Sequence, residues 1–282
     1  SLELRKVEDP DLIARTELAL DAVARRVAEH GIGPYPRSEE EILQLHRPPV
    51  PAFDETVGAW GYADADGTMV IAPAYADVQP FRDSVAWVRR PECETWELVD
   101  ESGKLLIDAS AGWLGVGSFS EGLAWVSRDG GGNWVAIDKN NRIVISTGFD
   151  DVRPFRRGLA AVRRGGWGAV DKSGRVLVPF RFHGFTTALT DGRYIDGFTD
   201  EGLAIVDVNG RKGVIDRNGR VIVPPTHPAV VIHPVAFLIS SPSGAWGALD
   251  RRGKPLIEPT HPSRLAVIEE IDRLLADTKP VL

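Results

Sequence analysis

Aspartates recur along the sequence at a spacing that could support cation binding or acid–base chemistry. Six of them each stand four residues after the start of a similar segment: Asp64, Asp100, Asp138, Asp171, Asp216 and Asp250. A row of carboxylates could hold cations or act as bases. An aspartate that opens a β-turn, however, usually accepts hydrogen bonds from backbone N–H groups a few residues later. Three residues on stands a Gly or, once, Asn141, and both residue types tolerate positive φ, so we expect six turns and no metal array.

The histidines give the other indication of chemistry. Pro-Thr-His-Pro occurs twice, so that His227 and His261 each stand fifteen residues after a segment start, and His233 lies close to the first. These imidazoles are candidate metal ligands if the last two segments abut. In three other segments an aromatic ring takes the same position: Tyr75, Phe149 and Phe182. We therefore expect this position to hold a flat packing ring, and we expect no metal, no cofactor and no catalytic residue.

Other signatures of chemistry are absent from the sequence. There is no Gly-x-Ser-x-Gly elbow, no phosphate-binding Gly-x-x-x-x-Gly-Lys loop and no dinucleotide fingerprint after a strand. Cys93 is the only cysteine, which excludes an intrachain disulfide and a cysteine-rich zinc site.

The composition is that of a folded protein with an acidic balance. The chain has 282 residues, is 43% apolar and 26% charged, and carries a net charge of −7. Because phosphate binding needs a basic face, this balance argues against a nucleic acid partner. The N-terminal residues lack the order of a secretory signal and no run is long enough to span a membrane, so we expect a cytoplasmic protein without a membrane partner.

The aspartates belong to a segment that occurs six times. The segments start at Trp60, Trp96, Trp134, Trp167, Lys212 and Trp246, at spacings of 36, 38, 33, 45 and 34 residues. Each contains two short apolar runs around the Asp-x-x-Gly turn, then a loop, often with a Phe, and a third run such as "GLAWV". These runs are short, rich in β-branched residues and bounded by turn residues, which predicts a three-stranded antiparallel piece per segment. One such piece cannot bury its apolar face alone, so neighbours must stack.

This pattern resembles the WG-repeat family of bacterial proteins, whose units read Trp-Gly, two apolar residues, Asp-x-x-Gly, an apolar run ending in Pro, then Phe and Gly-Leu-Ala. The resemblance covers about residues 58–261. It implies an all-β repeat scaffold that acts as a binding or interaction module, and it brings no catalytic motif. The second and third segments lack the Gly after Trp, and the fifth has Lys212 in place of Trp.

The sequence thus predicts an all-β tandem array of six three-stranded repeats between helical ends. Residues 1–50 are expected to form a helical segment and a proline-rich linker, residues 51–262 the repeats, and residues 263–282 a capping helix and tail. In that helix Leu265, Ile268, Ile271 and Leu275 are expected on one side. Helices at both ends favour an open solenoid-like stack, with a closed six-bladed propeller as the alternative.

Candidate binding residues lie on the third run and beside it. One face of that run is nearly uniform, as in a core, whereas the other varies and carries Trp87 and Trp125 in adjacent repeats, with Trp113 between them. Exposed indoles would form a binding hot spot, although this face could also be buried. Arginines flank the same strands and suit a carboxylate, a phosphate or an acidic protein segment: Arg89, Arg90, Arg163 and Arg164.

The leading functional interpretation is a non-catalytic scaffold that binds another protein or a peptide. One alternative is a histidine-based, metal-dependent hydrolase or transferase. The other is an acidic inhibitor or immunity-type protein that neutralises a basic partner. The sequence leaves the oligomeric state open.

Overall fold

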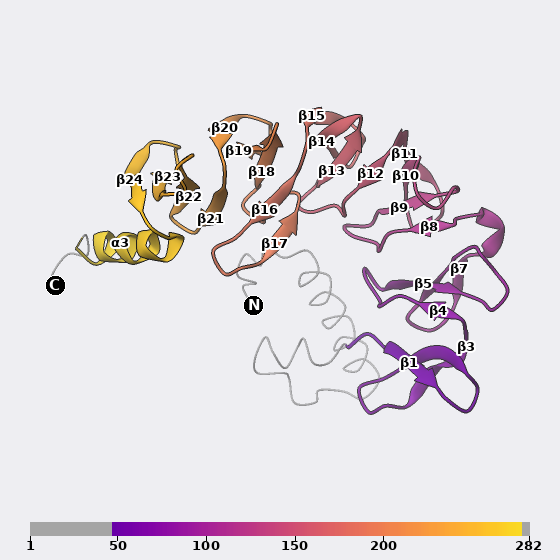
Figure 1. The fold of residues 1–282 in the computed structure, drawn as a ribbon. Coiled ribbons are helices and arrows are strands. Elements are labelled where there is room, and N and C mark those ends of the chain that lie inside the picture. The colour runs from indigo at the N-terminus through magenta and orange to yellow at the C-terminus, as the bar shows by residue number, and fades with distance from the viewer. Residues whose placement is uncertain (1–46, 278–282) are drawn as a thin grey trace, which may run out of the picture. The chain divides into compact units, whose positions relative to one another are not determined.

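The computed structural model describes residues 47–277, and the described chain is built almost entirely from short β-strands (Figure 1). The strands divide between two compact units. Unit 1 runs to Gly158 and includes the short turn Lys172–Gly174, and unit 2 comprises Leu159–Asp171 and the residues from Arg175 onward. The helices expected near the N-terminus lie outside the described residues.

Unit 1 contains three antiparallel sheets, with strand orders β1-β2-β3, β4-β5-β6-β7 and β8-β9-β10-β11. Its strands are β1 Val50–Asp54, β2 Ala59–Ala63, β3 Met69–Tyr75, β4 Asp77–Val78, β5 Val85–Arg89, β6 Glu97–Asp100, β7 Leu105–Ile107, β8 Gly115–Val116, β9 Ala124–Ser127, β10 Trp134–Ile137, β11 Ile143–Phe149 and β12 Asp151–Val152. A short 3-10 helix, η1 (Ala109–Ala111), follows β7.

Unit 2 continues the same pattern and ends in a helix. Its strands are β13 Leu159–Arg164, β14 Gly166–Asp171, β15 Val176–Phe182, β16 Thr186–Ala188, β17 Tyr194–Asp196, β18 Leu203–Val208, β19 Arg211–Asp216, β20 Val221–His227, β21 Val230–His233, β22 Ala236–Ser240, β23 Trp246–Asp250 and β24 Pro255–His261. The orders are β13-β14-β15, β16-β17, β18-β19-β20 and β21-β22-β23-β24, and α3 (Arg264–Asp277) follows the last sheet.

The six predicted hairpins are present, three in each unit: β2–β3, β6–β7, β10–β11, β14–β15, β19–β20 and β23–β24. The position expected to hold a flat ring lies directly across from the residue that starts the segment. Trp60 faces Tyr75, Trp167 faces Phe182 and Trp246 faces His261. Tyr75, Phe149 and Phe182 are buried, which confirms the packing role for the aromatic rings, whereas His227 and His261 are only partly buried.

The predicted grouping of three strands within one sequence segment is wrong. The third run of each segment pairs with the Trp strand of the following segment, as β5 does with β6 and β22 with β23. A sheet therefore straddles the boundary between two sequence repeats, and β1, from the region before Trp60, completes the first sheet. Several sheets also gain a fourth, short edge strand, such as β4, β8 and β21.

In four of the six hairpins, a glycine directly after the residue that starts the segment lets the outer strand cross closely. A Cβ built on Gly168 would lie 2.4 Å from the Val178 carbonyl oxygen, and one on Gly61 would lie 2.4 Å from that of Ile71. The register shifts at this point in both hairpins, so the outer strand bulges over the glycine. In the second segment this position is Glu97, and β7 stops after three residues.

Both faces of a sheet are buried against neighbouring sheets within unit 1. On β5, Ala86 and Val88 pack against Tyr62 of the preceding sheet. The residues that alternate with them, including Trp87, pack against Val126 of the following sheet. The expectation of one core face and one variable surface face is thus wrong, because a stacked sheet has two interfaces.

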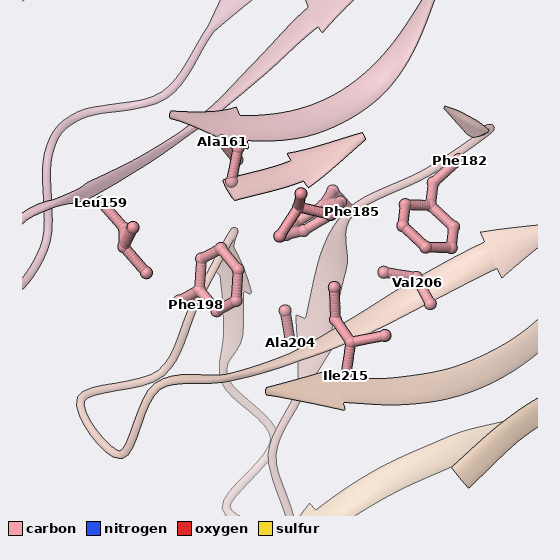
Figure 2. Packing of buried hydrophobic residues seen from close by; sticks show 10 residues of the cluster. Leu159, Ala161, Phe182, Phe185, Phe198, Ala204, Val206 and Ile215 are labelled. Atoms are coloured by element: carbon pink, nitrogen blue, oxygen red, sulfur yellow. The ribbon is translucent and has the colours of Figure 1, made fainter. Parts of the chain in front are cut away.

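The variable face in unit 2 shows how residue sizes compensate each other. Where β5 and β9 carry a Trp, β13 carries Ala161, which leaves space between its sheet and the next. The inserted segment around β16–β17 supplies Phe185 and Phe198 to this space, and their ring centroids lie 5.3 Å apart (Figure 2). This insertion accounts for the 45-residue spacing between Trp167 and Lys212.

Helix α3 covers the free face of the last sheet, as expected, but with a different stripe. Val267 and Ile271 are buried against residues of β22 and β23, and Ile268 is partly buried. Leu265 is 66% exposed and Leu275 is also exposed, so the four-residue stripe read from the sequence is only half right. No helix among residues 47–277 has the length and hydrophobicity needed to cross a membrane. The open stack, like the propeller, stays a prediction.

The close crossing at the Trp-Gly pair predicts that Gly168→Ala destabilises the protein. The new methyl group collides with backbone that cannot rotate away, so we expect a loss of about 1–3 kcal/mol in the free energy of unfolding, measured by urea denaturation. Gly131→Ala is the control, since a Cβ there meets nothing within 4 Å. Equal stability of the two variants would contradict the explanation.

Candidate functional site

The six repeated aspartates close turns. Asp138 Oδ1 accepts hydrogen bonds from the backbone N–H of Asn140 (2.9 Å) and of Arg142 (2.9 Å), and Asp250 makes the equivalent bonds with Arg252 and Lys254. The same pattern occurs at Asp64, Asp100 and Asp216, and Asp171 accepts from Arg175. No group of three His, Cys, Asp or Glu suited to a metal ion occurs within residues 47–277.

The three candidate histidines have separate surroundings. His261 Nε2 lies 2.7 Å from Glu270 Oε2 of α3. Burial lowers the pKa of His227, and burial also lowers that of His233 although the Asp272 carboxylate opposes the shift. His227 stands across from Lys212 in the register, in the position of the packing ring.

The three candidate tryptophans are buried, so the expected exposed pair of indoles is wrong. Trp87, Trp113 and Trp125 are 1%, 2% and 3% exposed. The indole N–H of Trp87 donates to the carbonyl of Gly117 (2.9 Å), and that of Trp125 donates to the carbonyl of Arg153 (2.9 Å). Trp125 also stacks on Phe155, with ring centroids 5.3 Å apart. Trp87 and Trp113 fill the core shared by the second and third sheets of unit 1, and Trp125 packs on Phe149 and Phe155, so none of the three is accessible to a partner.

The candidate arginines divide into two pairs. Arg89 pairs with Asp77 (3.3 Å), and Arg90 pairs with the buried Glu97 (2.8 Å), whose hydrogen bond raises the pKa of Arg90. Both are therefore partly engaged within the protein. Arg163 and Arg164 are exposed at the end of β13, and no ion pair is found for either in the described part of the chain.

A hollow of about 360 Å³ opens in unit 1, beside Trp113. It is lined by Leu106, Ile107, Asp108, Ser110, Ala111, Arg128 and Asn141. The Arg128 guanidinium lies over the Trp113 ring, 4.6 Å from its centroid, and the indole N–H donates to Asn141 Oδ1 (2.8 Å). The hollow forms where β7 ends early and the chain turns into η1.

The outer strands of the sheets in both units expose aliphatic side chains. Each of the six hairpins ends in a strand at a sheet edge that carries an exposed aliphatic residue: Val70, Leu105, Leu106, Ile143, Val144, Val176, Val221 and Leu256. We call these residues the edge row. Prolines interrupt four of the outer strands, namely β3, β15, β20 and β24, whereas β7 and β11 contain none.

Sequence reasoning missed the residues that line the hollow. Asn141 was noted only because it replaces a turn glycine, and its φ of 60° fits that role. The one signal in the sequence was an Asn in place of Gly at this turn. In the structure its side chain accepts a hydrogen bond from the Trp113 indole, which compensates for the early end of β7. Arg128 and Asp108 carry no pattern of their own in the sequence.

The architecture is that of a tandem array of small antiparallel sheets that share cores with their neighbours. The chain belongs to the family described as WG containing repeat, whose pattern matches residues 60–90, 98–131, 132–166 and 167–211, just over half of the 282 residues. The resemblance noted in the sequence is thereby confirmed. Beyond residue 211, β19–β20 and β23–β24 repeat the same hairpin with the same bulge.

No curated protein matches the sequence. Among solved structures, the computationally designed Ika8 protein is 14% identical over 77% of this chain and 76% of its own, with a TM-score of 0.35. Hsv2 from Kluyveromyces lactis is 9% identical over 71% and 72%, with a TM-score of 0.40. BamB from Moraxella catarrhalis is 17% identical over 61% and 60%, with a TM-score of 0.36. Scores of this size do not establish a shared fold.

The buried indoles predict that Trp125→Phe destabilises the protein although the ring is largely kept. The substitution leaves the Arg153 carbonyl without its donor, which we expect to cost about 1–3 kcal/mol in the free energy of unfolding. The control is Trp134→Phe, because Trp134 is half-buried and its indole N–H has no hydrogen-bond partner among the described residues. Equal urea midpoints for the two variants would show that the hydrogen bond of Trp125 does not contribute to stability and would contradict the prediction.

The turn aspartates predict a loss of stability in acid. Burial alone raises the pKa of Asp100, but hydrogen bonds from Ser102 and Lys104 outweigh it, and the Lys254 backbone N–H lowers the pKa of Asp250. A carboxyl with a lowered folded pKa stabilises the protein above its unfolded pKa of about 3.9 and loses this effect as the pH falls further.

We therefore expect the urea midpoint to fall between about pH 4 and pH 2, and to fall less in the double variant Asp100→Asn, Asp250→Asn. Asp66→Asn, an exposed residue of the same kind of turn, is the control and should keep the full decline. An unchanged slope in the double variant would show that these carboxylates do not contribute.

Proposed function

We propose that this protein is a non-catalytic repeat scaffold that binds another protein or a peptide, and that an extended segment of the partner pairs with the outer edge of β11. The observation that carries the proposal is the edge row on strands whose backbone is unpaired on the outer side within the described residues. An exposed strand edge with apolar side chains is a template for strand addition.

Proline distinguishes β11 from most of its equivalents. Proline lacks a backbone N–H and blocks pairing, so natural proteins use it to guard edge strands. The outer strands β3, β15, β20 and β24 carry such a proline, and β7 has only three residues. β11 has seven residues and no proline, and it presents the exposed Ile143 and Val144. It is the long outer strand left open to pairing in the described chain.

The charge beside β11 favours a partner segment with acidic residues. Arg142 directly precedes the strand and is exposed, and Lys104 stands in the same position before β7. The backbone N–H of each donates to its turn aspartate, which fixes the turn while the cationic side chain extends from it. A segment with alternating apolar residues and an acidic flank would match both features. The alternatives of a metal-dependent enzyme and of an acidic inhibitor gain no supporting contact among residues 47–277.

The experiment imports the guarding proline into β11. Ser146 occupies the position that Pro179 holds in β15 and Pro224 holds in β20, twelve residues after the segment start, so Ser146→Pro should fold. Peptides selected by display on the folded wild-type protein should bind Ser146→Pro at least tenfold more weakly. Ser146→Thr keeps the backbone N–H and should bind as the wild type does.

Two outcomes would contradict the proposal. One is equal binding of the selected peptides to wild type and to Ser146→Pro, and the other is a failure of display to enrich any peptide. Amide hydrogen exchange in the bound wild-type protein should show added protection in β11, and protection elsewhere alone would also count against it.

A further inference from the structure

The hollow beside Trp113 provides hydrogen-bond donors that the protein itself does not use. In the described part of the chain no carboxylate lies within ion-pair distance of the Arg128 guanidinium. The adjacent Asp129 cannot serve, because its carboxylate accepts from Ser127 Oγ (2.6 Å), from the Gly132 N–H (2.9 Å) and from Asn133 Nδ2 (2.8 Å). Arg128 is instead held against the face of a buried indole.

This contact prepares the guanidinium for a planar anion. Stacking on an aromatic face holds the guanidinium plane, and its N–H groups then form a fork that matches a carboxylate. Trp113 is itself fixed, because its indole N–H donates to Asn141 Oδ1 (2.8 Å). The Asn141 carbonyl oxygen accepts this bond. The NH₂ group of the same side chain therefore remains as a second donor at the hollow.

The other residues that line the hollow indicate what kind of molecule carries the anionic group. The exposed Leu106 and the partly buried Ala111 supply a small apolar surface beside these polar groups. Asp108 supplies an acceptor: its Oδ1 accepts from the Ser110 N–H (2.8 Å) and from the Ser110 hydroxyl, and these bonds lower the pKa of Asp108, so it stays ionised. A ligand that is only an anion would be repelled by this carboxylate, whereas one that also carries an N–H would bond to it.

We propose that the hollow binds an acylated α-amino acid with a free carboxylate and an apolar side chain. Arg128 and Asn141 receive the carboxylate, Asp108 accepts from the amide N–H, and the side chain lies against Leu106 and Ala111. This chemistry has two sources: the C-terminal residue of a peptide, and a free N-acyl amino acid. A volume of about 360 Å³ accommodates one such residue.

The peptide source is compatible with strand addition at β11. Asn141 stands two residues before the start of β11, so a segment paired antiparallel to this strand would bring its C-terminal end towards Asn141. The proposal for the hollow does not rest on that pairing, since a free N-acyl amino acid tests the hollow alone.

The experiment is titration calorimetry of the full chain with four probes. N-acetyl-leucine should bind and N-acetyl-leucinamide, which lacks the carboxylate, should bind at least tenfold more weakly. A peptide that ends in leucine and its C-terminally amidated form give the second pair. If N-acetyl-leucine binds and the peptide acid does not, the source is a free N-acyl amino acid. If the peptide acid binds more tightly than N-acetyl-leucine, the source is the C-terminal residue of a peptide.

Three variants connect the binding to the hollow. Arg128→Gln removes the cation and should weaken acid binding at least tenfold, and Arg128→Lys, which keeps the charge but not the fork, should weaken it by a smaller factor. Asn141→Gly restores the turn residue of the other repeats, removes both the NH₂ donor and the acceptor for Trp113, and should also weaken binding. Arg163→Gln, an exposed arginine of unit 2, is the matched control and should bind as the wild type does.

The proposal is overturned if the acid and amide probes bind equally, if Arg128→Gln binds N-acetyl-leucine as the wild type does, or if no probe binds at millimolar concentration. The Ser146→Pro variant separates this result from the proposed function. It should keep its affinity for N-acetyl-leucine even where it loses the displayed peptides, because it leaves the hollow unchanged.

Discussion

A sheet of three or four short strands has too little apolar surface to fold alone, and this constraint governs the whole molecule. The β4–β7 sheet of unit 1 buries one face against the sheet before it and the other against the sheet after it, with Ala86 and Val88 on one side of β5 and Trp87 on the other. The side chain that one sheet projects must therefore fit the space that its neighbour leaves. Trp87 fills that space directly in unit 1, and in unit 2 Ala161 does so with Phe185 from an insertion.

The repeated turn and the repeated glycine serve this stacking. The turn aspartate fixes the hairpin through backbone hydrogen bonds, and the glycine after Trp lets the outer strand bulge across the central one. Where a repeat departs from this pattern, the neighbours compensate. Glu97 replaces the glycine in the second repeat, β7 ends early, and Trp113 and Asn141 rebuild the contact between the two sheets. The compensation leaves a hollow with an arginine that has no carboxylate partner in the described chain, so this irregular repeat carries an unfilled polar site.

The sequence was sufficient for the features that depend on local chemistry. The six hairpins, the turn role of the aspartates and the ring facing the start position follow from residue types at fixed spacing. The pairing of the third run was missed because a periodic sequence has no intrinsic beginning, so any frame describes the letters equally well. The burial of Trp87 and Trp125 was left open because alternation along a strand identifies two faces but does not say whether both are covered.

The candidate site was beyond sequence reasoning for a different reason. Arg128, Asn141 and Asp108 come from three segments that meet only because two sheets stack, and none of them recurs with the repeat. Even the C-terminal helix was read only in part. Its periodicity is compatible with two neighbouring stripes, and the surface of the last sheet selects Val267 and Ile271 over Leu265 and Leu275.

The most direct test of this account is native-state hydrogen exchange in a Trp87→Ala variant. If neighbouring sheets share one core, the cavity between them should lower protection of the amides in β9, Ala124–Ser127, together with those in β5, although no strand of one sheet pairs with a strand of the other. Loss of protection confined to β4–β7, with β9 unchanged, would show that each sheet is stable by itself and would contradict the account.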